Sequence, residues 1–446
     1  MKEKKILEAL ETVEYTLTLQ TFAAGDVVNY SGDGTDANAG SFNVNSGSAV
    51  STGDLAVEMK EFYNKALIAL ADAKLVHDQF GKKQPIPKNG GRSIEWRKFT
   101  KLNKALTPIT EGVTPTGNKL KATNITASID QYGDYVEQTD LLEMTAVDNT
   151  IVEATKELSS QAGLTIDTLI RNELVGGANV MYVPKRTLAG VETAVTSRAD
   201  LDPTSLLTVK DVFKASAILK SVNAPMIDGS YVAIIHPEVA YDLMMNADKL
   251  WIDIQKYTTP DNMLKGEIGK LGGVRFVEST EAKRTAPAEI SDGFTRLTVK
   301  TDASASTSVV INEELTAATP STAIPVYVNG VANTITQIST TSHVTTLTLG
   351  SAVTVTAGKV ICGKGAAKDG SAVYATLFLG ANAYGLVDIE GGGMEHIVKQ
   401  RGYGNDPLNQ RSSVGWKCTF AAKRLIEEYI LRAESCSSFS AAADSN

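Results

Sequence analysis

The stretch KKQPIPKNGGRSIEWRKFTKLNK, residues 82–104, decides how the rest of the chain is interpreted. It holds a single acid, Glu95, and apolar and polar residues alternate from 93 to 102, which predicts a β-strand. Its cations are Lys82, Lys83, Lys88, Arg92, Arg97, Lys98, Lys101 and Lys104. The stretch therefore predicts the outgoing strand of a strongly basic arm.

A second alternating run returns from this arm. Residues 122–136 alternate through Ile125, Ala127 and Ile129, and Pro108 with the run EGVTPTG at 111–117 marks the tip. The two runs predict one long hairpin over 84–136, with both of its faces half polar. An isolated ribbon of this kind is marginal in water, so we expect the hairpin to lie on another surface.

A helical pattern over 140–174 follows the hairpin and begins with a capping-box-like Thr139, Asp140 and Glu143. At 1.5 Å per residue, its roughly 35 residues span about 50 Å. Most of its charges are acidic: Glu143, Asp148, Glu153, Glu157, Asp167 and Glu173. A basic arm next to an acidic helix favours repeated contact between copies of the chain.

We expect this contact to use one set of residues on each side. The set predicted for the arm is Lys88, Arg92, Trp96, Arg97, Lys98, Lys101 and Lys104, and the set for the helix is Glu143, Asp148, Glu153 and Glu157. Surface charge pairs are worth about 0.2–1 kcal/mol each. They would therefore align the subunits in an assembly more than supply its binding free energy. Two alternatives stay open for the arm: a solvated basic face, and nucleic-acid binding by Trp96 and Phe99 between the cations.

Length and composition set broad limits. A chain of 446 residues predicts two or three domains, and 43% hydrophobic residues can build a core. A net charge of −8 and a pI near 5.3 argue against a surface that binds nucleic acid everywhere. Three scattered cysteines indicate neither a disulfide framework nor a zinc site and fit a reducing cytosol. No run approaches the roughly 20 apolar residues that span a membrane, and no export signal is evident.

The remaining segments differ in character. Residues 1–53 form an arm rich in Gly, Ser, Asn and Asp, either disordered or bound to a partner, and 54–83 predicts an amphipathic helix ended by Gly81. Residues 205–295 alternate helical and strand patterns. Residues 296–369 are rich in Thr, Ser and Val and predict a small separate β module. Residues 370–411 return to the residue pattern of 205–295. Residues 412–446 predict terminal strands and, from Cys436, a loose Ser/Ala tail.

Catalytic signatures are missing. Of the four histidines, His77, His236, His343 and His396, none has a second ligand at metal-binding spacing, and His236 at a strand end has no nucleophile signature beside it. The run GEIGKLGG at 266–273 lacks the Gly-Lys-Ser/Thr ending of a phosphate loop and precedes a strand. No G-x-S-x-G occurs. We therefore expect no enzyme activity, no cofactor and no metal.

Eight stretches, in this order, carry a resemblance: LAVEMKEFYNKALIALADAKLVHDQFG, IPKNGGRSIEWRKFTKL, LTPITEGVTPTGNKL, IDQYGDYVEQTDLL, YVAIIHPEVAYDL, GEIGKLGGVRFVES, TLFLGANAYGLVDIEGGG and DPLNQRSSVGWKCTFAAKRLIEEYILRAES. The chain resembles the HK97-type major capsid proteins of tailed phages, in particular the N4 gp56-like family. The resemblance covers about residues 54–285 and 370–435. It implies an α+β fold whose order is N-arm, extended E-loop hairpin, peripheral domain with a long spine helix, and axial α/β domain.

The resemblance also implies roles for the segments. Residues 84–136 would be the E-loop lying across a neighbouring subunit, 137–204 the peripheral domain with its spine helix, and 205–295 with 370–411 the axial domain. Residues 412–446 would return to the peripheral domain. The least matched segment, 296–369, would be an inserted, surface-exposed module.

The implied function is a shell. Copies would assemble into hexamers and pentamers of an icosahedral capsid that encloses a double-stranded DNA genome, with portal or decoration proteins as further virion partners and no membrane. An encapsulin-like protein compartment shares the fold and is the alternative. A surface-layer or adhesin protein is a third reading, based on the Thr-rich module, and the missing export signal speaks against it.

Overall fold

The computed structural model describes residues 76–446 except 107, 109–110, 113, 115–116, 146–149, 188–189, 248–266, 390–393, 402–407 and 442. All of these residues belong to one compact unit, Lys65–Asn446. The predicted N-terminal arm over 1–53 and most of the predicted helix over 54–83 lie outside the described residues.

A seven-stranded mixed sheet forms the centre of this unit. Its path is β5 (Val180–Tyr182), β22 (Ile430–Ser435), β18 (Val373–Leu379), β8 (Tyr231–Ile235), β10 (Val274–Glu278) and β9 (Glu267–Leu271), with β11 (Arg284–Thr285) paired to β18. Every residue of β8 and β18 is buried. These strands read as continuous apolar runs because both faces of the sheet are covered.

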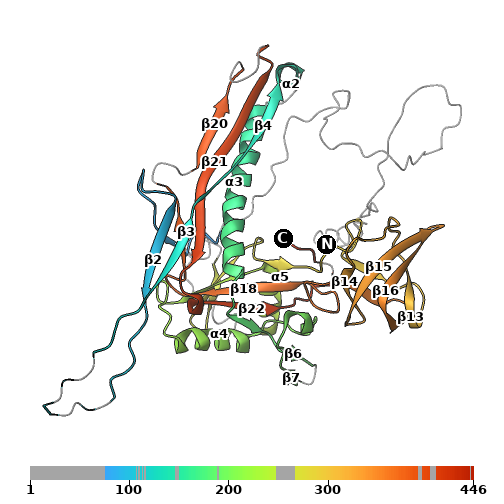
Figure 1. The fold of residues 1–446 in the computed structure, drawn as a ribbon, viewed down its shortest axis with the longest axis horizontal. Helices are drawn as coiled ribbons and strands as arrows, with labels where there is room; N and C mark the ends of the chain where they lie inside the picture. The colour runs from blue at the N-terminus through green and yellow to red at the C-terminus, as the bar shows by residue number, and fades with distance from the viewer. Residues whose placement is uncertain are drawn as a thin grey trace, which may run out of the picture. The chain divides into compact units, whose positions relative to one another are not determined.

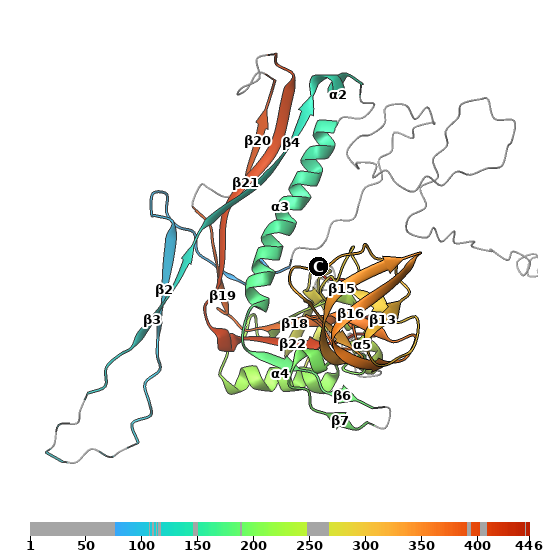
Figure 2. The same cartoon turned by 45° about the vertical axis from the view of Figure 1, so that its right-hand side comes forward.

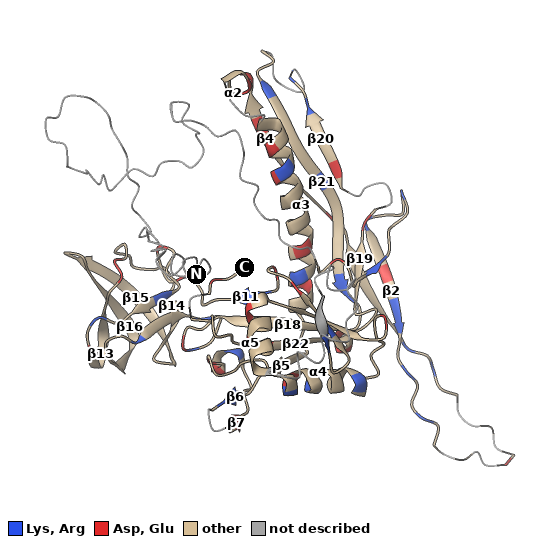
Figure 3. Cartoon of the chain, turned by 180° about the vertical axis from the view of Figure 1, so that it is seen from behind, with Lys and Arg blue, Asp and Glu red and all other residues tan. Residues whose placement is uncertain are grey.

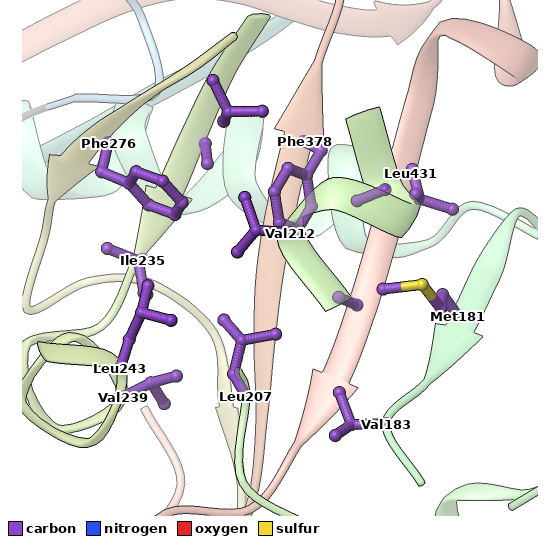
Figure 4. Close-up of a cluster of buried hydrophobic side chains, with 14 of the residues drawn as sticks. Met181, Val183, Leu207, Val212, Ile235, Val239, Leu243, Phe276, Phe378 and Leu431 are labelled. Carbon is purple, nitrogen blue, oxygen red and sulfur yellow. The ribbon is translucent and has the colours of Figure 1, made fainter. Parts of the chain in front are cut away.

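Helices cover the two faces of this sheet. On one face lie α4 (Val209–Ser221), which begins with a capping box of Thr208 and Asp211, and α5 (Pro237–Ala247). Figure 4 shows Val212 of α4 and Leu243 of α5 in the same cluster as Phe276 and Phe378 of the sheet. The other face packs on the C-terminal half of α3 (Thr150–Val175). The predicted alternation of helices and strands over 205–295 therefore builds a three-layer core.

A second sheet packs against the N-terminal half of α3. Strand β21 (Arg411–Arg424) pairs along its length with β4 (Asp130–Thr139) and also with β20 (Glu395–Lys399) and β19 (Tyr384–Val387), and β1 (Lys82–Lys83) joins β19. In both Figure 1 and Figure 2, α3 runs alongside β4 and β21. The predicted continuous helix over 140–174 is described as two helices, α2 (Asp140–Thr145) and α3, with 146–149 outside the described residues.

The arm differs from its prediction at one strand. Strand β2 (Ser93–Phe99) pairs with β3 (Ala122–Ser128), but the run that was predicted to continue to 136 leaves the hairpin at Ile129. Residue Ile129 is 3% exposed among Ile86 and Val387, and the chain then pairs as β4 with β21. The prediction of a single hairpin strand over 122–136 was therefore wrong. Burial of Ile129 turns the chain out of the arm and into the second sheet.

Residues 296–363 form a sheet of their own. Its six strands run in the order β12 (Arg296–Thr298), β17 (Val360–Gly363), β14 (Ile324–Val328), β15 (Val331–Thr341), β16 (Val344–Val355) and β13 (Ala303–Ile311). The end strands meet as well, because Lys300 N donates to Val310 O at 2.8 Å and Asn312 N donates to Thr298 O at 2.9 Å. The sheet therefore closes into a small barrel around its own apolar cluster, and closure removes the free edges that invite aggregation.

The Ser/Ala tail from Cys436 was predicted to be loose, and this was wrong. Cys436, Ser437 and Ser440 are each 1% exposed or less, and Ala372 N donates to Ser440 O at 2.9 Å. The Ser438 hydroxyl donates to Asp242 of α5 at 2.6 Å. Small residues pack closely and hydroxyls hydrogen-bond, so a segment with few apolar side chains is ordered here by polar contacts. The remaining short elements are β6 (Lys185–Arg186), β7 (Glu192–Thr193), and 3-10 turns at Arg198–Asp200 and Glu427–Tyr429.

Candidate functional site

The base of the basic arm is fastened to its own chain. The Trp96 indole Nε1 donates to Gln84 Oε1 at 3.0 Å, and the ring lies against Gly385 of β19 so closely that a Cβ there would be 2.8 Å from a ring carbon. Arg92 pairs with Asp130 at 2.6 Å, and its Nε donates to Ile129 O at 2.9 Å. Two residues predicted to touch a neighbour, Arg92 and Trp96, thus already hold the arm's direction.

Beyond this base the arm makes few contacts with its own chain. The last backbone hydrogen bond of the β2–β3 ladder joins Thr100 N to Lys121 O at 2.9 Å. Arg97 lies 3.6 Å from Glu95, whereas Lys88, Lys98, Lys101 and Lys104 are exposed and have no ion pair with any described residue. Figure 3 shows the cations on β2. Four large apolar side chains are also exposed: Phe99, Leu102, Leu106 and Leu120.

The acids predicted on the helix are mostly satisfied within the chain. Glu143 of α2 binds Arg401 at 2.5 Å, and Glu153 of α3 binds Lys156 one turn away at 2.7 Å. Glu157 is exposed and has no ion pair among the described residues, and Asp148 lies outside them. No ion pair in the described part of the chain joins the basic set to the acidic set. The free acidic surface of the helix is thus smaller than the sequence indicates.

The outer face of the second sheet carries a groove that the sequence did not reveal. Trp416 and Asp134 both hydrogen-bond Gln161 of α3, so their neighbours along the strands point to the opposite face. There Gly415 sits against Tyr135, with a Cβ position only 2.7 Å from the Tyr135 Cβ. The groove has a volume of about 650 Å³ and is walled by Tyr135 and Ile397. The two glycines that line it, Gly133 and Gly415, are the sequence signal that could have pointed to it.

The charges around this groove are balanced. Glu137 lies 3.7 Å from Arg411, and Glu395 lies 3.2 Å from Lys417. This face of the sheet has a hollow, an aromatic wall and both signs of charge, which suits an extended polypeptide better than a small charged ligand.

His77 and His236 are buried, and His343 pairs on the surface. His77 is fully buried, its Nδ1 lies 2.7 Å from Asp167 of α3, and its carbonyl oxygen accepts from the Tyr384 hydroxyl at 2.6 Å. The His236 ring packs on Tyr374 with a centroid distance of 5.2 Å, and burial lowers the His236 pKa. Exposed His343 pairs with Glu314 at 2.9 Å, which raises the His343 pKa.

The described residues contain no group of three or more His, Cys, Asp or Glu side chains that could hold a metal. Within the same residues, no helix is both long enough and apolar enough to cross a membrane.

Comparison with known proteins finds no match by sequence and many matches by structure. No protein-family model matches the chain. No curated protein matches it either. Many solved structures share its fold, and phage capsid chains are among them.

A chain from the capsid of Ralstonia phage GP4 is 12% identical and superposes with a TM-score of 0.53, over 88% of this chain and 98% of its own length. A chain of the cyanophage Pam1 capsid is 11% identical with a TM-score of 0.52, over 87% and 99%. A chain of the cyanophage P-SCSP1u capsid is 12% identical with a TM-score of 0.50, over 84% and 92%. The chain therefore has a phage capsid fold.

Proposed function

We propose that this chain is the major capsid protein of a tailed bacteriophage, of the N4 gp56-like family and with an HK97-type fold. The observation that carries the proposal is the extent of the shared fold, which includes 98% of the capsid chain of phage GP4. At 12% identity this likeness concerns the fold, so the function remains our inference. The exposed arm formed by β2, β3 and the tip between them suits a role in contacts between subunits.

Each segment then has a part in the shell. Residues 84–128 form the E-loop, 130–204 the peripheral domain with β4 and spine helix α3, and 205–295 with 370–411 the axial domain that gathers in hexamers and pentamers. Residues 296–369 form an inserted module on the surface of the particle, and 412–446 return to the peripheral domain. Residues 1–53 are the N-terminal arm.

The arm joins neighbouring subunits in this proposal. Exposed Phe99, Leu102, Leu106 and Leu120 supply affinity, because burying one such side chain fully is worth about 1.5–3 kcal/mol. Lys88, Lys98, Lys101 and Lys104, which have no ion pair among the described residues, orient the arm on the partner together with Arg97. Glu157 remains an acceptor on the helix, and the groove beside Tyr135 and Ile397 is a further surface for the arm.

Repetition of this contact around a closed shell makes the assembly cooperative. Packaged double-stranded DNA is enclosed without sequence readout, which agrees with a net charge of −8. Portal and decoration proteins are further partners in this proposal. No observation on the described residues or from the comparisons favours the encapsulin-like alternative.

Electron microscopy of the purified protein tests the proposal. Negative-stain images should show closed shells, and particles purified from an infected host should hold double-stranded DNA. A protein that stays monomeric at every concentration would refute the proposal. Shells filled with an enzyme and free of nucleic acid would replace it with the encapsulin-like alternative.

A matched pair of charge reversals tests the arm. Lys98→Glu with Lys101→Glu should impair shell assembly while the monomer keeps its thermal unfolding transition. The control reverses two exposed lysines of the barrel, Lys300 and Lys359, which also have no ion pair among the described residues, and should assemble normally. Normal shells from the arm variant would show that the arm's charge does not contribute to assembly.

A further inference from the structure

Where helix α3 meets the segment 279–286 and strand β12, the structure holds a site filled by residues 443–446. We propose that this junction, called here the tail site, is a peptide-binding site that selects an asparagine at position 446. We further infer that its occupation locks α3 to the central sheet. Neither statement depends on the proposed shell function.

The side chain of Asn446 is recognised through both ends of its amide. Its Nδ2 donates to Thr280 O at 3.2 Å and to Ala282 O at 2.9 Å, while its Oδ1 accepts from Arg284 N at 2.7 Å. Two carbonyl acceptors and one N–H donor match a primary amide. An aspartate in this position would place a carboxylate oxygen against two carbonyl oxygens, so the site discriminates between two side chains of equal shape.

Two cations complete the pocket around the Asn446 main chain. Its carbonyl oxygen accepts from Arg171 Nη2 at 3.2 Å and from Lys283 Nζ. Arg171 belongs to α3, is 3% exposed, and also donates to Glu281 O at 3.0 Å. Burial lowers the pKa of both Arg171 and Lys283, so neither cation is well solvated here. The main-chain oxygen of Asn446 between them offsets that desolvation.

The three preceding residues are held through both backbone and side chain. Ser445 Oγ accepts from Ala286 N at 3.1 Å, and the Asp444 carbonyl accepts from Arg284 Nε. The Ala443 carbonyl accepts from Arg296 Nη2 of β12 at 2.8 Å, and the Asp444 carboxylate lies 3.8 Å from Arg296. Four consecutive residues thus bridge α3, the β10–β11 segment and the first strand of the barrel.

The contacts of this segment are polar, and only Ala443 among its four residues is buried. A segment held in this way opens at lower free energy than the core does. The site can therefore exchange its own segment for an equivalent peptide. While the segment is bound, Asn446 links Arg171 to Thr280 and Ala282. This link adds to the direct hydrogen bond from Arg171 to Glu281 O and strengthens the attachment of the end of α3 to the segment 279–286, which joins two strands of the sheet.

Peptide binding to a shortened chain tests the site directly. The variant ends at residue 442, and the probe is a fluorescently labelled peptide of residues 437–446. Fluorescence anisotropy should show saturable binding to the variant and binding at least about tenfold weaker to the full-length chain, where the attached segment competes. The same peptide with Asn446→Asp should bind at least about tenfold more weakly than the native peptide. Equal binding of the two peptides, or no binding to a cooperatively folding variant, would overturn the proposal.

Hydrogen exchange on the full-length chain tests it without truncation. Asn446→Asp should speed the exchange of the Arg284 and Ala286 amides at least about tenfold, because both donate to the segment. It should also speed the exchange of amides in the last turn of α3. The control Asn329→Asp makes the same chemical change at an exposed turn of the barrel and should alter neither. Unchanged exchange in Asn446→Asp would contradict both the selectivity and the lock.

Discussion

The arm tip, residues 100–121, and the tail, residues 436–446, look alike in sequence and behave differently in the structure. Both are polar and contain few large apolar side chains. The described residues of the arm tip are all exposed, whereas Cys436, Ser437 and Ser440 are buried and Asn446 makes hydrogen bonds through its side chain and its main chain. Order in such a segment depends on whether the folded body offers matching donors, acceptors and cations.

The tail meets such a surface in its own chain, and the arm tip does not. Arg171 and Lys283 face the tail with desolvated cations, and Arg284 donates its backbone N–H to Asn446. The arm tip instead presents Lys101 and Lys104 without ion pairs to any described residue. Because of this difference we propose that the arm binds a neighbouring copy of the chain, whereas the tail binds its own chain.

The largest effect is expected from removing the buried cation of the tail site. Arg171→Met should lower the free energy of unfolding by about 3 kcal/mol, because Glu281 and the Asn446 carbonyl lose their partner in a desolvated place. Denaturant unfolding of the unassembled chain measures this. Lys101→Met makes the same kind of change in the arm tip and should stay within about 0.5 kcal/mol of the wild type. Equal losses in the two variants would erase the contrast between the segments.

The base of the arm should show an intermediate effect. Trp96→Ala removes a half-buried ring from Gly385 and a hydrogen bond from Gln84, and should cost about 2 kcal/mol. Phe99→Ala, three residues further along and 62% exposed, should change stability by less than about 0.5 kcal/mol. Thermal unfolding of both variants locates the point at which the arm stops depending on the body. A large loss from Phe99→Ala would place that point further out.

Limited proteolysis compares the two segments within one sample. Chymotrypsin should cut the unassembled chain at Leu102 or Leu106 about ten times faster than at Phe439, because cleavage follows the population of the open segment. Phe439 is 49% exposed but lies in the docked tail and packs on Tyr241 with a centroid distance of 5.7 Å. Mass spectrometry of early fragments gives the rates. Faster cleavage at Phe439 would show that the tail detaches readily.

The smallest effect concerns the thiol at the start of the tail and leaves stability unchanged. Burial raises the pKa of Cys436, and it raises that of Cys362 to about 11, so at pH 8 only about one Cys362 thiol in a thousand is ionised. We expect an alkylating reagent to spare both cysteines in the folded chain at pH 8 and to label them in denaturant. An introduced Leu102→Cys in the arm tip should react at once. Rapid labelling of native Cys436 would mean an undocked tail.

Local patterns predicted much of the fold. The alternation around Ile94 and Trp96 predicted β2, the apolar steps over 150–174 predicted α3, and the run YVAIIH predicted the buried strand β8. The order of these patterns indicated a phage capsid fold, which the solved capsids share. Periodicity carries this information because it reflects contacts between each residue and its own helix or strand.

The candidate site was predicted less well, because its chemistry depends on partners distant in sequence. The pairing of Glu143 with Arg401 spans more than half of the chain, and no local pattern around Glu143 reveals it. Trp96 was predicted to contact a neighbouring subunit because the sequence does not reveal its contact with Gly385 of the same chain. Glu157, Lys98 and Lys101 remain available because no described residue happens to pair with them.

The sequence by itself determined the element types, the basic character of the arm and the lack of catalytic motifs, since these follow from residue type and short-range spacing. Only the tertiary structure decided that β4 pairs with β21, that Ile129 ends the arm, and that Asn446 docks between Arg171 and Arg284. The physical reason is that register, burial and ion pairing are settled between segments that meet only after folding. A polar segment such as the tail is ordered by the surface on which it docks. The arm tip meets no such surface among the described residues of its own chain.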